Sequence, residues 1–152
     1  MGNLDQLRAA VSRRLESLPA LAGIPVVPED RQNIKSEIDR ALGKAGGIVI
    51  TVSMGNARGV APADPLPQAE VDVVVECAEI PAINRAPAGR QTPAVTASVL
   101  AVCALHHWPW ERGAVLTFSE TQYDRDDKSS LVIYTCIFTT RVTFAAQLGL
   151  GE

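Results

Sequence analysis

The chain has 152 residues, of which 47% are hydrophobic and 20% charged, and its formal net charge is −3. This length and balance predict one folded domain over residues 1–152 rather than a disordered chain. Charges of both signs are scattered along the chain, so the basic stripe of a nucleic-acid interface is missing and no nucleic-acid specificity is expected. No apolar run reaches the roughly 20 residues of a membrane span, and residues 1–14 read as a polar amphipathic segment, so we expect a cytoplasmic protein without membrane association.

Helical spacing predicts a first helix, with Asn3 as its cap and Gln6 in the capping-box position. Its apolar face consists of Leu4, Leu7, Val11, Leu15 and Leu18. Residues 24–27 lie beside Pro25 and Pro28, which favours an edge strand or a connector over a central strand. A second, short helix is expected at Ile34, Ile38, Ala41 and Leu42, ended by Gly43 and Gly46.

Alternation of apolar with smaller or polar residues predicts strands at residues 47–54 and 68–78. The apolar positions are Ile48, Ile50, Val52 and Met54 in the first strand and Ala69, Val71, Val73, Val75 and Cys77 in the second. One face of such strands is buried and the other is exposed to solvent. In a doubly wound nucleotide-binding fold both faces of the sheet are covered, so the pattern argues against that fold. We therefore expect an α+β domain whose twisted, mostly antiparallel or mixed sheet has about four to five strands, with helices packed on one face.

Residues 55–67 are rich in Gly, Pro and Ala, and we expect a mobile loop that does not pair as a strand. After a second irregular stretch at residues 80–91, Thr92 is the expected N-cap of a helix that extends through His107. The face expected to pack closely on the sheet consists of Ala94, Val95, Ser98, Val99, Val102 and Cys103. A strand at residues 114–119 should follow.

Residues 131–144 form the most informative segment. Their even positions make an apolar face interrupted only by Thr140, while Leu131, Ile133 and Ile137 make half of the odd face apolar as well. Fourteen extended residues span roughly 46 Å, about twice a typical strand. Because a small domain can hardly cover both faces over that length, the segment indicates self-association.

No catalytic or metal site follows from the remaining candidates, and no cofactor is expected. Cys103 and His106 are in Cys-x-x-His spacing, but no second pair of ligands stands at a recognisable distance. Residues 123–128 lack the glycine and the distant glutamate of a calcium loop, so a solvated hairpin turn is expected there.

Neither a G-x-S-x-G elbow nor a phosphate-binding loop is present. Cys77, Cys103 and Cys136 are odd in number and lie in apolar surroundings, so we expect buried free thiols.

Three features of the chain stand out together: residues 7–11 (LRAAV), the acidic residues 123–127 (YDRDD) that lead through Ser129 and Ser130 into the long last strand, and the order of helices and strands between them. In these features the chain resembles the tail terminator (minor tail protein U) family of phages and prophages. The first and last thirds of the chain carry the resemblance, and the middle matches only in element order.

The resemblance implies a non-enzymatic virion tail component that forms a homo-oligomeric ring, a hexamer, caps the tail tube and offers a surface for head joining. Its partners would be tail-tube and head-completion proteins. Candidate partner contacts are Asn56, Arg58, Arg85, Arg90, Asp124, Asp126 and Asp127, and candidate subunit contacts are Leu131, Ile133 and Ile137. For each charged residue, an ordinary solvated loop charge remains an equal alternative.

Two other functions stay open at this point. One is a small intracellular binding module for a ligand or a protein, with residues 55–67 as a flexible lid. The other is a metal-dependent hydrolase that uses Cys103, His106 or Asp126.

Overall fold

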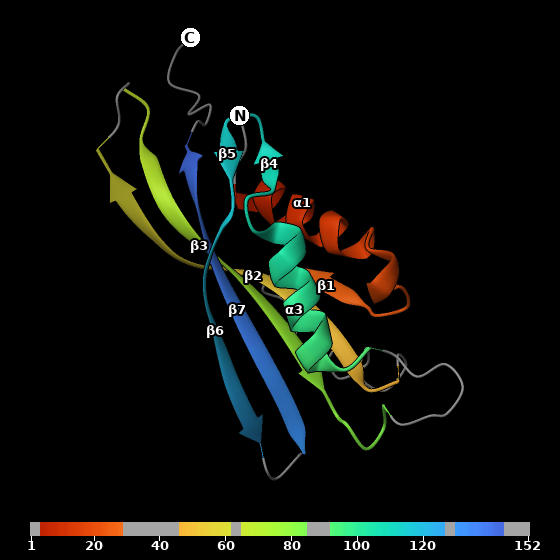
Figure 1. Cartoon of the computed structure of the whole chain (residues 1–152). Helices are drawn as coiled ribbons and strands as arrows, with labels where there is room; N and C mark the ends of the chain where they lie inside the picture. The colour runs from red at the N-terminus through yellow and green to blue at the C-terminus, as the bar shows by residue number, and fades with distance from the viewer. Residues whose placement is uncertain (1–3, 29–45, 62–64, 85–91, 127–129, 145–152) are drawn as a thin grey trace.

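A computed structural model shows an α+β fold with a five-stranded mixed sheet (Figure 1). It describes residues 4–28, 46–61, 65–84, 92–126 and 130–144. The helical elements within these ranges are α1 (Leu4–Glu16), the 3₁₀ turn η1 (Pro19–Leu21) and α3 (Ala94–Leu105). The main sheet has the spatial order β1 (Val26–Pro28), β2 (Ile48–Val60), β3 (Gln68–Glu79), β7 (Leu131–Thr143) and β6 (Thr117–Asp126). A separate hairpin consists of β4 (Pro109–Glu111) and β5 (Ala114–Val115).

Both helices lie on the same side of the main sheet, as expected (Figure 1). The inner face of α1 buries Leu7, Val11 and Leu15 completely. α3 contributes the small side chains Ala97 and Ala101 to the same core, so its backbone comes close to the sheet. β1 is parallel to β2, and the other pairs of the main sheet are antiparallel. Neither described helix has the length and apolar character of a bilayer span.

The alternation in β3 and β7 is confirmed. β3 pairs with β7 from Gln68 opposite Thr143 to Glu79 opposite Val132. The odd positions of β3 and the even positions of β7 turn toward the helices, where Phe138 is the largest fully buried side chain. β1 is the short edge strand that the flanking prolines predict.

Thr140, the polar exception on the buried face of β7, holds the β4–β5 hairpin to the main sheet. Its side chain is only 5% exposed. The Trp110 indole N–H donates to Thr140 Oγ1 at 2.9 Å, and the Thr140 hydroxyl donates to the Val115 carbonyl at 2.8 Å. The hydroxyl is therefore satisfied as acceptor and as donor, which offsets the cost of burying it.

A carboxylate from the sheet holds the start of α3, where the sequence predicts a Thr92 cap. The structure gives α3 no side-chain cap from its own N-cap residue, Pro93, and the Thr92 hydroxyl donates instead to the Ala20 carbonyl at 2.9 Å. Glu79 Oε1 accepts from the Ala94 backbone N–H at 3.0 Å, and Glu79 Oε2 accepts from the Asn84 side chain at 2.6 Å. A negative group at this end also suits the helix dipole.

The expected loop at residues 55–67 is wrong over its first half. β2 continues to Val60 and pairs with β3, with a bulge between Met54 and Ala57 that absorbs the glycine-containing segment. A lid needs a loop that can leave the sheet, so residues 55–60 are not available to the binding-module interpretation as part of its lid.

Three further expectations need correction. α3 ends at Leu105, because the backbone of His106 is already extended (ψ 125°), and His107 then takes a left-handed conformation (φ 59°). Residues 123–126 are paired strand rather than a turn, and residues 114–119 divide between β5 and β6. On α3, Val95, Val99 and Cys103 are exposed rather than packed on the sheet.

Asn3 and the helix expected around residues 34–42 lie outside the described residues, so both stay predictions.

Thr140→Val should lower the free energy of unfolding by about 1–3 kcal/mol, because it leaves the buried Trp110 N–H and the Val115 carbonyl without a partner. Urea titration followed by tryptophan fluorescence measures the effect. Thr139→Val, on the opposite face of the same strand, is the control and should leave the midpoint nearly unchanged. Equal effects of the two substitutions would contradict the role of the hydroxyl.

Glu79→Ala should also destabilise the fold by about 1–3 kcal/mol, since the Ala94 N–H and the Asn84 amide lose their acceptor. Hydrogen exchange adds a local readout, because protection should fall first in the opening turn of α3. The exposed Glu120 provides the control, as Glu120→Ala. Unchanged exchange at Ala94 in the Glu79 variant would show that another group caps the helix.

Candidate functional site

The predicted contact residues that the structure describes lie on β2, β6 and β7. We call the face of the main sheet turned away from α1 and α3 the far face. Arg85, Arg90 and Asp127 fall outside the described residues, so their predicted contacts stay predictions. Asn56 is exposed at the bulge of β2.

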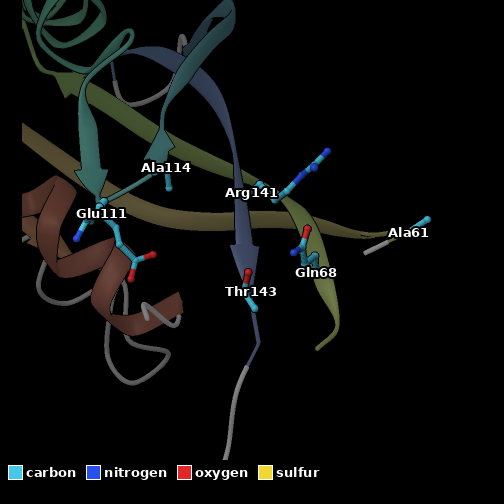
Figure 2. A pocket seen from close by; sticks show the side chains of 8 residues that line it. Ala61, Gln68, Glu111, Ala114, Arg141 and Thr143 are labelled. Atoms are coloured by element: carbon cyan, nitrogen blue, oxygen red, sulfur yellow. The ribbon is translucent and has the colours of Figure 1, made fainter. Parts of the chain in front are cut away.

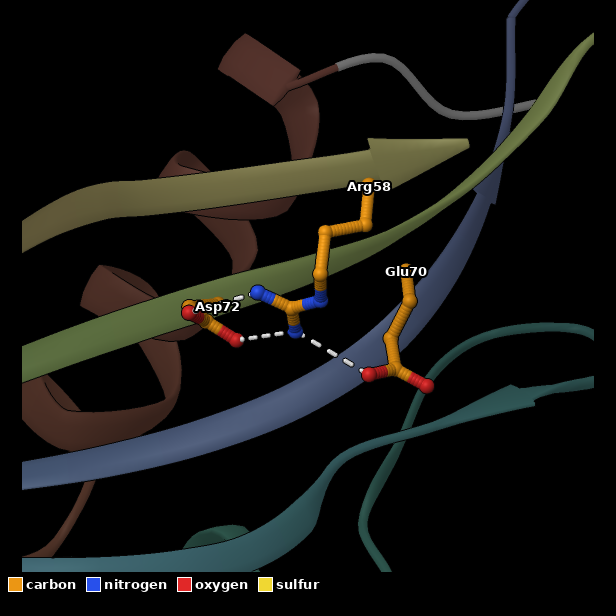
Figure 3. A network of polar contacts seen from close by, with 3 residues as sticks. All are labelled: Arg58, Glu70 and Asp72. Atoms are coloured by element: carbon orange, nitrogen blue, oxygen red, sulfur yellow. Dashed lines mark hydrogen bonds and ion pairs between the residues drawn. The ribbon is translucent and has the colours of Figure 1, made fainter. Parts of the chain in front are cut away.

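Arg58 is held on the far face by two carboxylates of the neighbouring strand (Figure 3). Its Nη2 lies 2.9 Å from Asp72 Oδ1 and 3.0 Å from Glu70 Oε1, and its Nη1 lies 3.3 Å from Asp72 Oδ2. The hydrogen bonds that the Arg58 guanidinium donates to Asp72 and, second, to Glu70 raise its pKa. Arg58 is therefore already paired with two carboxylates, so its guanidinium is not free for an acidic partner.

A polar hollow of about 440 Å³ lies between the β4–β5 hairpin and the adjacent ends of the main sheet (Figure 2). Arg112 lines it from the hairpin, Arg141 and Thr143 from β7, and Gln68 from β3, while Glu111 supplies an acid. Its described lining residues supply charged, amide and hydroxyl groups.

The other end of the far face combines acidic and apolar side chains. On β6, Asp124 stands opposite Ile133 and Asp126 opposite Leu131. Ile133 and Leu131 pack beside the buried Val49. The predicted subunit contacts are therefore only partly exposed, and some of their apolar surface is already used within the chain.

The structure does not bring the predicted charged residues into one site. Arg58 stands opposite Glu70, which in turn faces Arg141 on β7, whereas Asp124 stands opposite Ile133. Arg141 lies eight residue steps from Ile133, or roughly 26 Å along β7. The two charged groups are separate surfaces at opposite ends of the far face.

The sequence prediction missed an apolar surface on the outer side of α3. Val95 is 47% and Val99 56% exposed. None of the twelve residues of this helix is charged. Beside them an apolar groove of about 340 Å³ separates α3 from β6 and β7. We call this the α3 surface; its defining residues are Val95, Val99, Val102, Cys103, Phe118 and Tyr134. The signal in the sequence is that α3 is apolar on every side.

The candidate metal ligands that the structure describes do not form a metal site. The Phe118 backbone N–H donates to His106 Nδ1 at 3.0 Å, so this nitrogen is already engaged. Among the described residues, no group of three or more His, Cys, Asp or Glu side chains is placed to hold a metal ion. Cys103 is exposed, which corrects the expectation of three buried thiols, whereas Cys77 and Cys136 are buried.

Comparison with known proteins finds solved structures that resemble this chain. No family model matches the sequence, and no curated protein matches it. A chain of a solved structure described as the virion of a native gene transfer agent particle has a TM-score of 0.59 and 23% sequence identity, over 91% of this chain and 95% of that chain. At this identity the likeness shows a shared fold. A second solved chain, with 15% identity over 97% of this chain and 100% of its own length, has a TM-score of 0.48, too low to carry an argument.

The three thiols should differ in reactivity toward an aromatic disulfide reagent. Burial raises the pKa of the Cys77 thiol, and burial likewise raises that of Cys136, so at about pH 8 both stay protonated and unreactive. Cys103 should react rapidly in the folded protein, and all three thiols should react in denaturant. Cys103→Ser is the control, and rapid labelling of that variant under native conditions would contradict the buried placement.

Proposed function

We propose that this chain is a structural component of a phage or phage-like particle, forming a ring that terminates the tail tube and prepares it for head joining. The observation that carries the proposal is the α+β fold it shares with a chain of the gene transfer agent virion, a phage-like particle. The match covers nearly all of both chains, so the resemblance concerns the whole unit and not a common subdomain inside a larger protein.

The narrower role, tail termination, is supported by the sequence resemblance to the tail terminator family. Its motifs map to the inner and outer faces of α1 and to the end of the β6–β7 hairpin. Both sites are surface or packing elements, and the proposed role needs no catalytic residue. The role is that of an assembly part, whose specificity comes from shape and surface chemistry.

The surfaces of the chain suit an assembly part. The α3 surface and the apolar part of the far face lie on opposite sides of the sheet, so a protomer can contact two neighbours at once. For contacts with tail-tube or head-completion proteins, the described candidates include Asn56 at the bulge and Asp124 and Asp126 near the end of β6. Arg58 is less suited to that role, because Asp72 and Glu70 already occupy its guanidinium.

Deletion of the gene from its particle-producing locus should give tails of uncontrolled length that lack heads, because nothing stops the tube from growing or completes its head-proximal end. Electron microscopy of the particles measures tail length and head attachment. Re-expression of the wild-type chain should restore both, and an epitope tag on it should be detected at one end of the tail.

Two results would overturn the proposal. Normal particles after a clean deletion would remove the role in assembly. Tag density along the whole tail, or on the head shell, would leave a virion protein but not a terminator.

A further inference from the structure

The outer side of α3 is apolar where a solvent-facing helix side is normally polar. A helix that is apolar on all sides is usually buried on all sides. α3 buries Ala94, Ala97 and Ala101 against the sheet but leaves Val95 and Val99 about half exposed. The α3 surface therefore has the composition of a contact that another molecule covers.

A second apolar surface lies on the far face, toward the hairpin end of β7. Leu131, Ile133 and Ile137 project there and are only partly buried, and the polar Thr135, opposite Glu76 on β3, lies between Ile133 and Ile137 on the same face. We call them the far-face patch. Glu120 stands opposite Ile137, and Asp124 opposite Ile133, so the patch has an acidic margin along β6.

The α3 surface and the far-face patch are complementary in type of secondary structure, in length and in the charge at their margins. In layered domains an apolar sheet face is covered by a helix, and an apolar helix side packs on a sheet. Twelve helical residues extend about 18 Å, and the six residue steps from Leu131 to Ile137 extend about 20 Å. The α3 surface has a cation at its margin, Arg14, whose Nε–H donates to the Ala104 carbonyl at 3.3 Å, and the patch has acids at its margin.

We infer that the α3 surface of one copy packs on the far-face patch of a second copy. Since the two surfaces lie on opposite faces of the same chain, the contact is head-to-tail and leaves one surface of each kind unused in every pair. Such a contact either closes into a ring or continues into a filament. The inference rests on the proposed function for the choice of the ring, while the contact itself is argued from this chain alone.

Two substitutions test the two sides of the contact one at a time. Val99→Glu places a charge in the α3 surface, and Ile137→Glu places one in the far-face patch next to the acidic margin. Ile137 is chosen because it lies outside the small cluster that Ile133 and Leu131 form with Val49. Val115→Glu is the matched control, since Val115 is 45% exposed on β5, outside both surfaces. Circular dichroism and thermal melting establish that each variant is folded.

Analytical ultracentrifugation of each protein, and of an equimolar mixture of the two variants, tests the inference. The wild-type chain and Val115→Glu should form the same oligomer. Val99→Glu and Ile137→Glu should each sediment as monomers, with the dissociation constant raised about 30-fold or more. In the mixture, the intact α3 surface of the Ile137 variant meets the intact patch of the Val99 variant. A one-to-one dimer that grows no further should therefore appear.

Several outcomes would overturn the inference. A wild-type monomer or a mixture that stays monomeric would exclude the head-to-tail contact. Loss of the oligomer in Val99→Glu alone would indicate two α3 surfaces packed on each other, and persistence of the oligomer in both variants would place the contact elsewhere. None of these results bears on tail length after gene deletion, so failure of the contact and failure of the proposed function are distinguishable.

Discussion

The central strand β3 pairs along its whole length with β2 on one side and with β7 on the other. This double pairing decides which side chains of three strands turn toward the helices. Val73 stands opposite Met54 and opposite Phe138, so all three enter the same core. A shift of one residue in β3 would turn Glu70 and Asp72 into that core, and burying unpaired carboxylates there would be prohibitively costly. The pattern of the sheet thus fixes the side on which α1 and α3 can pack.

Two polar side chains then attach the outer elements to the sheet. Thr140 binds the β4–β5 hairpin through Trp110, and Glu79 binds the first turn of α3. Both are buried at positions where an apolar residue would fill the space but would leave backbone or indole N–H groups without an acceptor. Hydrophobic burial accounts for the existence of the layer of helices, and these directional bonds account for where its parts sit.

The parts of the fold that depend on local alternation could be predicted from the sequence. β3 and β7 follow from residue spacing alone, because burial on one face imposes a period of two. The extension of β2 through Gly55 and Asn56 could not be predicted in this way, since the pairing partner β3 overrides the local preference of these residues. The cap of α3 comes from a residue fifteen positions earlier in the chain, which no local motif reveals.

Local sequence patterns also predict the candidate surfaces only in part. Because α3 is apolar on every side, its spacing cannot tell the buried face from the exposed one, and Val99 was assigned to the wrong face for that reason. Arg58 reads as an available cation in the sequence, and only the strand register places Asp72 within reach of it. The far-face patch was found because the odd positions of β7 change from apolar to polar along the strand, a pattern that is visible without any partner.

The bulge in β2 has a consequence for how copies of this chain can associate. Within the described residues, β1 covers β2 only from Ile50 to Val52, and the rest of that edge runs on past Met54 to Val60. A long flat edge of this kind would recruit strands of other copies and grow into aggregated sheets. The bulge bends the strand and breaks its row of regularly spaced hydrogen-bonding groups, and the exposed Arg58 adds a bulky charged side chain beside it. Edge-to-edge growth along β2 is thereby discouraged, and on this side of the sheet contacts between faces remain the route by which copies can come together.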